Sequence, residues 1–236
     1  SPPPTPPPPL APPPSPPLPS PPPPGPPPPP YWEGLSSPAP TFADIDADGD
    51  LDLILGLQSG ELRYYENQNG SLVLRPPPYN PVALAQPSNA SDLTPDVGRF
   101  HSGGGLELVV GSSINGLRAA AHVSGVLNVP GGTSGSFVPY SSAVSPVNGL
   151  GIRPNSAPAL ADLDGDGMSD LLLGGADGRL LFVPNQGDHA TANFEGTACW
   201  VMAAAGPVDC TALLVPLITG NGWSSPTASD LDGDGD

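Results

Sequence analysis

The chain lacks residues that several protein classes need. It contains no lysine, so its six basic residues are all arginine, against 23 acidic residues and a formal net charge of −17. Because nucleic-acid binding needs clustered Lys and Arg at the phosphates, this balance argues against a nucleic-acid partner. No apolar run approaches the roughly 20 residues of a membrane-spanning helix, so we expect no membrane span.

Cysteine is also scarce, with Cys199 and Cys210 as the pair. Two close cysteines in an acidic chain rich in Pro, Gly, Ser and Thr indicate a disulfide formed in an oxidising compartment. The alternative is two buried free thiols, which are common in protein cores. No C-x-x-C motif or neighbouring histidine favours a zinc site at these cysteines.

Proline is abundant at the N-terminus, where 22 of the first 30 residues are proline. Proline lacks the backbone donor and fixes φ, so residues 1–30 cannot form a helix, a central strand or a packed core. We expect a polyproline II stalk of roughly 90 Å, and a globular domain over residues 31–236. The chain opens without a signal segment, which predicts a mature or internal piece of a protein.

The Ser-Pro-Pro-Pro blocks of this stalk resemble the extensin and volvocine cell-wall glycoproteins of plants and green algae. The resemblance covers the stalk alone. It implies hydroxylated prolines that carry short O-linked sugars, and an extracellular location. The alternatives are an unmodified stiff spacer and a ligand for an SH3-like groove.

The remaining residues contain self-similar segments, each beginning at a proline. Pro40–Gly56 reads PTFADIDADGDLDLILG, and Pro158–Gly174 reads PALADLDGDGMSDLLLG. A worn copy, Pro95–Gly111, keeps the apolar frame and the final glycine but has lost the acids, and a fourth copy starts at Pro226. The repeats predict units over about 36–90, 91–153 and 154–221, with a partial unit over 222–236.

Each complete unit shows one pattern of short strands. A strand leads into the acidic loop, and an apolar strand follows it, Leu51–Leu55 in the first unit and Leu171–Leu173 in the third. An alternating strand, Glu61–Glu66, and a fourth near Leu72–Leu74 complete the first unit. Helical periodicity is absent and turn residues recur, which predicts an all-β fold. Four short antiparallel strands per unit favour the blades of a β-propeller.

These segments resemble FG-GAP/VCBS repeats, the calcium-binding blades of integrin-α-type β-propellers. The resemblance covers about residues 36–236, strongly in the first and third units and weakly in the second. Such propellers usually close with about seven blades, so the ring is incomplete in this chain. The resemblance therefore implies that the ring continues past Asp236 or that other chains complete it.

The acidic loops themselves indicate a metal. Five aspartates lie within nine residues of the first unit: Asp44, Asp46, Asp48, Asp50 and Asp52. An oxygen-only ligand set indicates a hard cation, and the flexible spacing favours Ca²⁺ over Mg²⁺. An EF-hand is excluded, since Leu55 stands where its bidentate Glu would be. The alternatives are an empty, solvated turn and a pair of catalytic acids, which would need the separate walls of a cleft.

The FG-GAP pattern implies ligands at loop positions 1, 3, 5 and 9, with the backbone carbonyl of position 7. In the first unit these are Asp44, Asp46, Asp48, Asp52 and the carbonyl of Asp50. In the third unit they are Asp162, Asp164, Asp166, Asp170 and the carbonyl of Met168. In the broken fourth unit, Asp230, Asp232 and Asp234 match. The second unit has Arg99, His101, Gly103 and Glu107 at positions 1, 3, 5 and 9, and we expect it to bind no ion.

Other features are less specific. Asn69 and Asn89 begin N-glycosylation sequons. The tryptophans could line a sugar platform or pack between blades: Trp32, Trp200 and Trp223. The histidines show no triad or zinc pattern, so we expect surface or hydrogen-bonded side chains: His101, His122 and His189.

The sequence as a whole predicts an extracellular structural glycoprotein that is not an enzyme. It would join a Ca²⁺-stabilised, propeller-like head to a rigid proline-rich stalk. We expect copies of the chain to assemble into a fibre, wall or surface appendage, with cell-wall or surface glycans as further partners. The alternatives are an adhesion or carbohydrate-binding module, and a non-catalytic propeller of a larger secreted enzyme.

Overall fold

The computed structural model describes part of the chain: 34–101, 105–114, 116–123, 135–141, 144–148, 150, 155–176, 178, 180–187, 192–194 and 223–228. The chain divides into two units, Ser1–Gly34 and Leu35–Asp236, and the fold below is that of the second. Several predicted features lie outside the described residues: the stalk, Cys199, Cys210, Trp32, Trp200, His189, Asp230, Asp232 and Asp234. The structure does not test the predictions made for these features.

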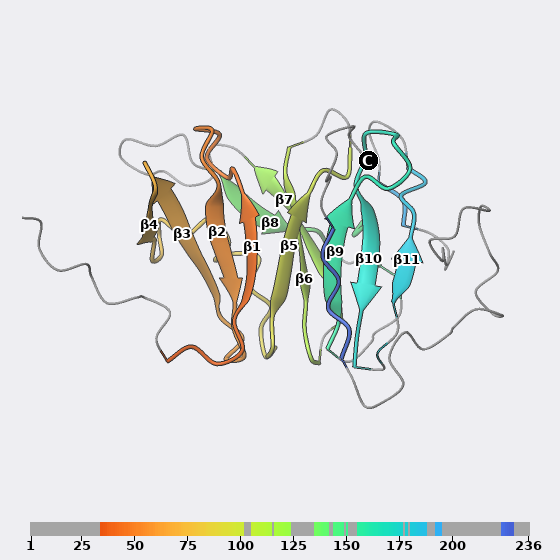
Figure 1. The fold of residues 1–236 in the computed structure, drawn as a ribbon, viewed down its shortest axis with the longest axis horizontal. Helices are drawn as coiled ribbons and strands as arrows, with labels where there is room; N and C mark the ends of the chain where they lie inside the picture. Colours follow the sequence, from red (N-terminus) through yellow and green to blue (C-terminus); the bar gives the residue numbers. More distant parts are fainter. Residues whose placement is uncertain are drawn as a thin grey trace, which may run out of the picture. The chain divides into compact units, whose positions relative to one another are not determined.

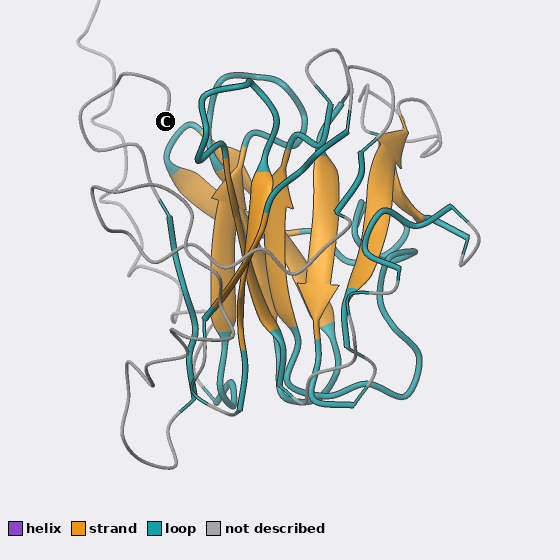
Figure 2. Cartoon of the chain, turned by 90° about the vertical axis from the view of Figure 1, so that its right-hand side faces the viewer, coloured by secondary structure: helices purple, strands orange, loops and turns teal. Residues whose placement is uncertain are grey.

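The second unit is built from three antiparallel sheets, and no helix occurs among the described residues (Figures 1 and 2). The first sheet contains, in order, β1 (Ala39–Ala43), β2 (Asp52–Gly56), β3 (Leu62–Gln68) and β4 (Ser71–Leu74). The second contains β5 (Thr94–Gly98), β6 (Glu107–Gly111), β7 (Arg118–Val123) and β8 (Ser136–Pro139). The third contains β9 (Ala157–Ala161), β10 (Asp170–Gly174) and β11 (Leu181–Val183). The all-β prediction is confirmed, and in the described part no helix could cross a membrane.

The first two strands of every sheet pair in the same register. Ala43 lies opposite Asp52 in the first sheet, and Ala161 lies opposite Asp170 in the third. The acidic loop is therefore the connection of a hairpin between two paired strands. Leu51, which we expected to begin the apolar strand, lies in the loop and is 58% exposed, because the strand starts at the buried Asp52.

The sheets pack face to face, and the middle one is buried on both faces. Leu108 and Val110 of β6 belong to the apolar cluster shared with the first sheet. Val109, between them, belongs to the cluster that contains Leu171 and Leu173 of β10. Successive side chains of a strand point to opposite faces, so the continuous apolar run of β6 serves two neighbours.

An equivalent backbone hydrogen bond connects each unit to the next, and we call this contact a joint. The amide of Leu93 donates to the carbonyl of Leu57 at 3.2 Å. The corresponding bonds run from Ser156 to Ser112 at 3.4 Å, and from Ser224 to Gly175 at 3.1 Å. The segment 223–228, blue in Figure 1, therefore joins the third sheet as β5 and β9 join the sheets before them.

A glycine makes each joint possible. Gly56, Gly111 and Gly174 end the second strand of their units. A Cβ atom at any of them would collide with a carbonyl oxygen of the following unit, that of Leu93, Ser156 or Ser224. The final glycine of the repeat is thus required by the close approach of two backbones, which explains why even the worn second copy keeps it.

Candidate metal centres

Each intact acidic loop brings three carboxylates together. One oxygen from each of Asp44, Asp46 and Asp48 lies within 4.8 Å of the others, in the loop between β1 and β2. The loop between β9 and β10 holds the equivalent triad, Asp162, Asp164 and Asp166, within the same limit. Loop positions 1, 3 and 5 therefore converge in both units, as the spacing predicts.

The first aspartate of each loop fixes the turn that makes this convergence possible. Asp44 accepts hydrogen bonds from the amides of Asp48 and Gly49, both at 3.1 Å. Asp162 accepts the same two bonds from Asp166 at 3.2 Å and from Gly167 at 2.7 Å. The two glycines have φ values of +95° and +85°, which favour a residue without Cβ.

The ninth residue of each loop anchors the loop to the sheet. Asp52 is buried and accepts hydrogen bonds from the amide of Ile45 at 3.1 Å, the hydroxyl of Tyr64 at 2.8 Å and the amide of Asn67 at 2.7 Å. In the third unit, Asp170 accepts from the amides of Leu163 at 3.0 Å and Asn185 at 2.7 Å. Both acids lie outside the triads, and their role as metal ligands stays a prediction.

The electrostatics of the loops fit a cation. Burial and the charges of the neighbouring Asp52 and Asp48 carboxylates together raise the pKa of Asp46 to about 6. One buried carboxylate oxygen of Asp46, Oδ1, has no hydrogen-bond partner among the described residues. Leaving a buried oxygen unpaired is costly. A hard cation would satisfy this oxygen and remove the repulsion between the carboxylates.

Similar forces act in the third unit. Burial and, to a smaller extent, the Asp164 and Asp166 charges raise the pKa of Asp170 to about 6. Burial and the Asp166 charge also raise the pKa of Asp164. The all-oxygen donor set of this loop again suits Ca²⁺.

The loop of the second unit, which has lost the aspartates, is held by hydrogen bonds between its own residues. Glu107 accepts a hydrogen bond from the amide of Phe100 at 3.0 Å, as Asp52 does from Ile45. Its other oxygen lies 3.0 Å from Nδ1 of His101, the residue at position 3. The two side chains are only 4% and 16% exposed, and burial raises the pKa of Glu107. An imidazole therefore lies beside the ninth-position acid where the intact loops have a third-position aspartate.

The other residues singled out in the sequence differ in exposure and in location. Asn69 and Asn89 are exposed, with left-handed φ values of +54° and +56°, so both sequons are accessible. Trp223 is 63% exposed. His122 lies in β7, and its side chain and Gly103 fall outside the described part.

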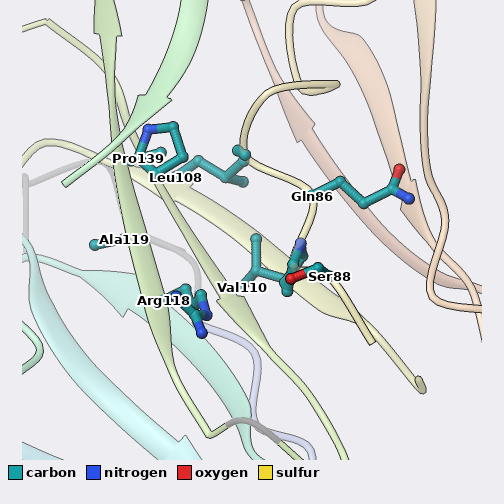
Figure 3. Close-up of a pocket in the computed structure, with 10 residues that line it drawn as sticks. Gln86, Ser88, Leu108, Val110, Arg118, Ala119 and Pro139 are labelled. Atoms are coloured by element: carbon teal, nitrogen blue, oxygen red, sulfur yellow. The ribbon is translucent and has the colours of Figure 1, made fainter. Parts of the chain in front are cut away.

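Sequence reasoning did not indicate two hollows that the described residues form. One, of about 130 Å³, lies between residues 85–88 and the strands β6 to β8 (Figure 3). Its lining combines apolar side chains, among them Leu108 and Val110 of β6, with Arg118 as the charged group. The other, of about 180 Å³, is lined by residues before β1, by residues around the starts of β5 and β9, and by the start of the segment 223–228, including Trp223. It is formed by sequence-distant residues, which no local pattern reveals.

No protein-family model matches the chain, and no curated protein matches it significantly.

Proposed function

We propose that the chain is an extracellular, non-catalytic structural glycoprotein whose globular part is a Ca²⁺-stabilised, propeller-like head. The proline-rich segment 1–30 would be its rigid stalk. The observation that carries this proposal is the pair of aspartate triads, found at the same register position of two units. Two such loops in register are better explained by one repeated ion site than by chance surface charge.

The residues that would hold the ions are the triads, the predicted carbonyls of Asp50 and Met168, and the predicted ninth-position ligands Asp52 and Asp170. The ion would supply positive charge, which neutralises the loop and ties two strands together. Asp52 and Asp170 would then hold the loop in place through the amides of the sheet. A structural role fits these loops because their acids lie in one hairpin and not on opposed walls of a cleft.

The contacts between the first strands of the units support the propeller-like arrangement. The first strands of the three units are neighbours, since β5 contacts both β1 and β9. Asp96 of β5 accepts hydrogen bonds from the hydroxyl of Thr41 at 2.7 Å and from the amide of Leu160 at 2.6 Å. A carboxylate that joins the first strands of three units suits blades that surround a common axis.

Calcium removal tests the head. We expect thermal unfolding of the purified chain to shift to lower temperature in EDTA and to return when Ca²⁺ is restored, since a ligand that binds only the folded state stabilises it. Mg²⁺ at the same concentration should restore much less stability, because it demands stricter geometry. Unchanged melting in EDTA would contradict the proposed metal role.

A further inference from the structure

The 180 Å³ hollow is separate from the metal loops. Its lining comes from residues just before β1, from residues before and at the start of β5 and β9, and from the start of the segment 223–228. The acidic loops follow the opposite ends of β1 and β9. We name this hollow, with Ser37, Asp92, Asn155 and Trp223 in its lining, the inner-strand pocket.

The repeat contributes one equivalent residue from every unit to this pocket. Each of these residues stands three places before the proline that starts its copy: Ser37, Asp92, Asn155 and Trp223. The first three have left-handed φ values of +48°, +52° and +54°. A single backbone geometry therefore delivers a hydroxyl, a carboxylate and an amide to one place, and the equivalent position of the fourth copy adds the indole of Trp223.

Two polar side chains of the pocket have unused hydrogen-bonding capacity. Among the described residues, neither the carboxylate of Asp92 nor the side-chain amide of Asn155 has a hydrogen-bond partner, and both are half-buried. The hydroxyl of Thr94, in contrast, already donates to the carbonyl of Ser156 at 2.7 Å. A carboxylate that accepts and an amide that both donates and accepts suit a ligand rich in hydroxyl groups.

The pocket also offers an apolar wall. Trp223 is 63% exposed, and the buried side chains of Leu93 and Ala157 complete this part of the lining. An exposed indole beside polar groups is a typical feature of binding surfaces. The volume of about 180 Å³ exceeds the ~150 Å³ of an apolar cavity that holds a benzene ring, so one six-membered ring fits.

We propose that the inner-strand pocket binds one pyranose ring of a neutral saccharide. The ring would lay its C–H face on the indole of Trp223 and direct hydroxyls to Asp92 and Asn155. This function goes beyond that of the calcium-stabilised head and does not depend on the ions.

Other ligand chemistries fit the pocket less well. An acidic sugar would be repelled by Asp92 and by the net charge of −17. A purely apolar ligand would leave the Asp92 carboxylate desolvated and unpaired. A proline-rich peptide could stack on Trp223, but proline has no N–H to donate to Asp92.

Ligand-observed NMR and calorimetry of the purified chain test this site, with methyl glycosides of neutral hexoses and the matching uronic acids as probes. We expect at least one neutral glycoside to bind with a dissociation constant on the order of 1 mM, as suits a ligand of this size. Saturation transfer should be strongest at its ring C–H protons, and the uronic acids should bind more weakly.

Variants locate the binding. Trp223→Ala should weaken it by about tenfold or more, whereas Trp223→Phe should keep most of it because the aromatic face remains. Asp92→Asn and Asn155→Ala should each weaken binding several-fold. Tyr79→Ala removes another exposed aromatic, 43% exposed and outside the pocket lining, and should change nothing. An unchanged melting temperature in Ca²⁺ shows that each variant is folded.

Several outcomes would overturn the proposal. They are full binding by Trp223→Ala, failure of every neutral glycoside to bind, and Trp223-dependent binding of a synthetic peptide of residues 1–30 in place of the glycosides. Saccharide binding that is lost in Asp46→Ala and Asp164→Ala but kept in Trp223→Ala would place the ligand at the metal loops instead. None of these results alters the EDTA test of the calcium-stabilised head, so the two proposals fail separately.

Discussion

Asp52, Glu107 and Asp170 occupy the same place in three loops and accept the same backbone hydrogen bond, from the second residue of the loop. The repeat pattern also predicts Asp52 and Asp170 as metal ligands, and that role stays a prediction. The structure shows that each of the three acids forms hydrogen bonds that tie the loop to the sheet or close the loop. The second unit keeps this acid although its triad is lost, which indicates that the anchoring role is independent of the ion.

At the residue scale, the triads predict how many ions are lost in each variant. Asp46→Ala and Asp164→Ala should each remove one Ca²⁺ from the total measured by calorimetry, with affinities of roughly 10⁻⁴–10⁻³ M for the sites that remain. Asp50→Ala removes the same charge but keeps the backbone carbonyl, so it should retain both sites. Loss of an ion in Asp50→Ala, or its retention in Asp46→Ala, would contradict this ligand assignment.

The His101–Glu107 pair gives a second prediction at this scale. His101→Ala should remove no Ca²⁺, because the second unit has no aspartate triad, but it should lower the melting temperature by exposing the buried Glu107. Leaving one partner of a buried hydrogen bond unpaired costs about 1–3 kcal/mol. Denaturant unfolding of His101→Ala and of His101→Gln, which keeps a donor, would measure this cost.

At the scale of the elements, the glycine joints hold one unit against the next. Gly111→Ala should destabilise the fold by about 2 kcal/mol or more, since its Cβ would collide with the backbone of Ser156. Gly70→Ala is the matched control in the β3–β4 turn, where a Cβ would have no atom within 4 Å. Its cost should be only the left-handed φ penalty of about 1 kcal/mol. Equal losses of stability in the two variants would contradict the close-approach explanation.

Asp96, which links β5 to β1 and β9 through hydrogen bonds, should make the stability of the fold depend on pH. Burial raises its pKa above the ordinary value of 3.8, although the bonds from Thr41 and Leu160 oppose this shift. The folded state therefore holds the proton more tightly than the unfolded state, so this contribution to stability is present below pH 3.8 and decreases as the pH rises through the folded pKa.

The comparison with Asp96→Asn isolates this effect from the other acids. The unfolding free energy of the natural chain minus that of Asp96→Asn should fall as the pH rises above 3.8 and then become constant. Thr41→Val, which removes the hydroxyl donor to Asp96, should make this fall steeper. Urea unfolding at saturating Ca²⁺ across this pH range measures it, and a difference that rises with pH would show the opposite sign of shift.

At the scale of the whole molecule, we expect assembly to use two different surfaces. The predicted proline stalk, roughly 90 Å long as polyproline II, would be preorganised, so its docking would cost little conformational entropy. A contact between the stalk of one copy and the head of the next would be heterologous, and heterologous contacts that do not close produce filaments.

We therefore expect the natural protein to form polar fibres and the deletion of residues 1–30 to abolish them. Electron microscopy and sedimentation of the two proteins measure this difference. The deleted protein should keep its Ca²⁺-dependent melting, which separates loss of assembly from loss of folding. Fibres of the same form without the stalk would show that the heads alone make the contacts.

The sequence by itself determined the local features of this protein. Turn residues, short apolar runs and the position of the loops predicted the strands, because strand periodicity and hairpin turns depend on neighbouring residues. The convergence of loop positions 1, 3 and 5 was predictable for the same reason, since eight residues between two paired strands leave few conformations.

Only the tertiary structure decided which residues from different units meet. It placed Asp96 between Thr41 and Leu160, 55 and 64 residues away in the chain, and it gathered Asp92, Asn155 and Trp223 around one pocket. It also showed that the buried ninth-position acids are anchors, because burial and hydrogen-bond partners depend on the packed sheet and not on the motif. Contacts between units arise from how the sheets stack, and no spacing along the chain specifies that arrangement.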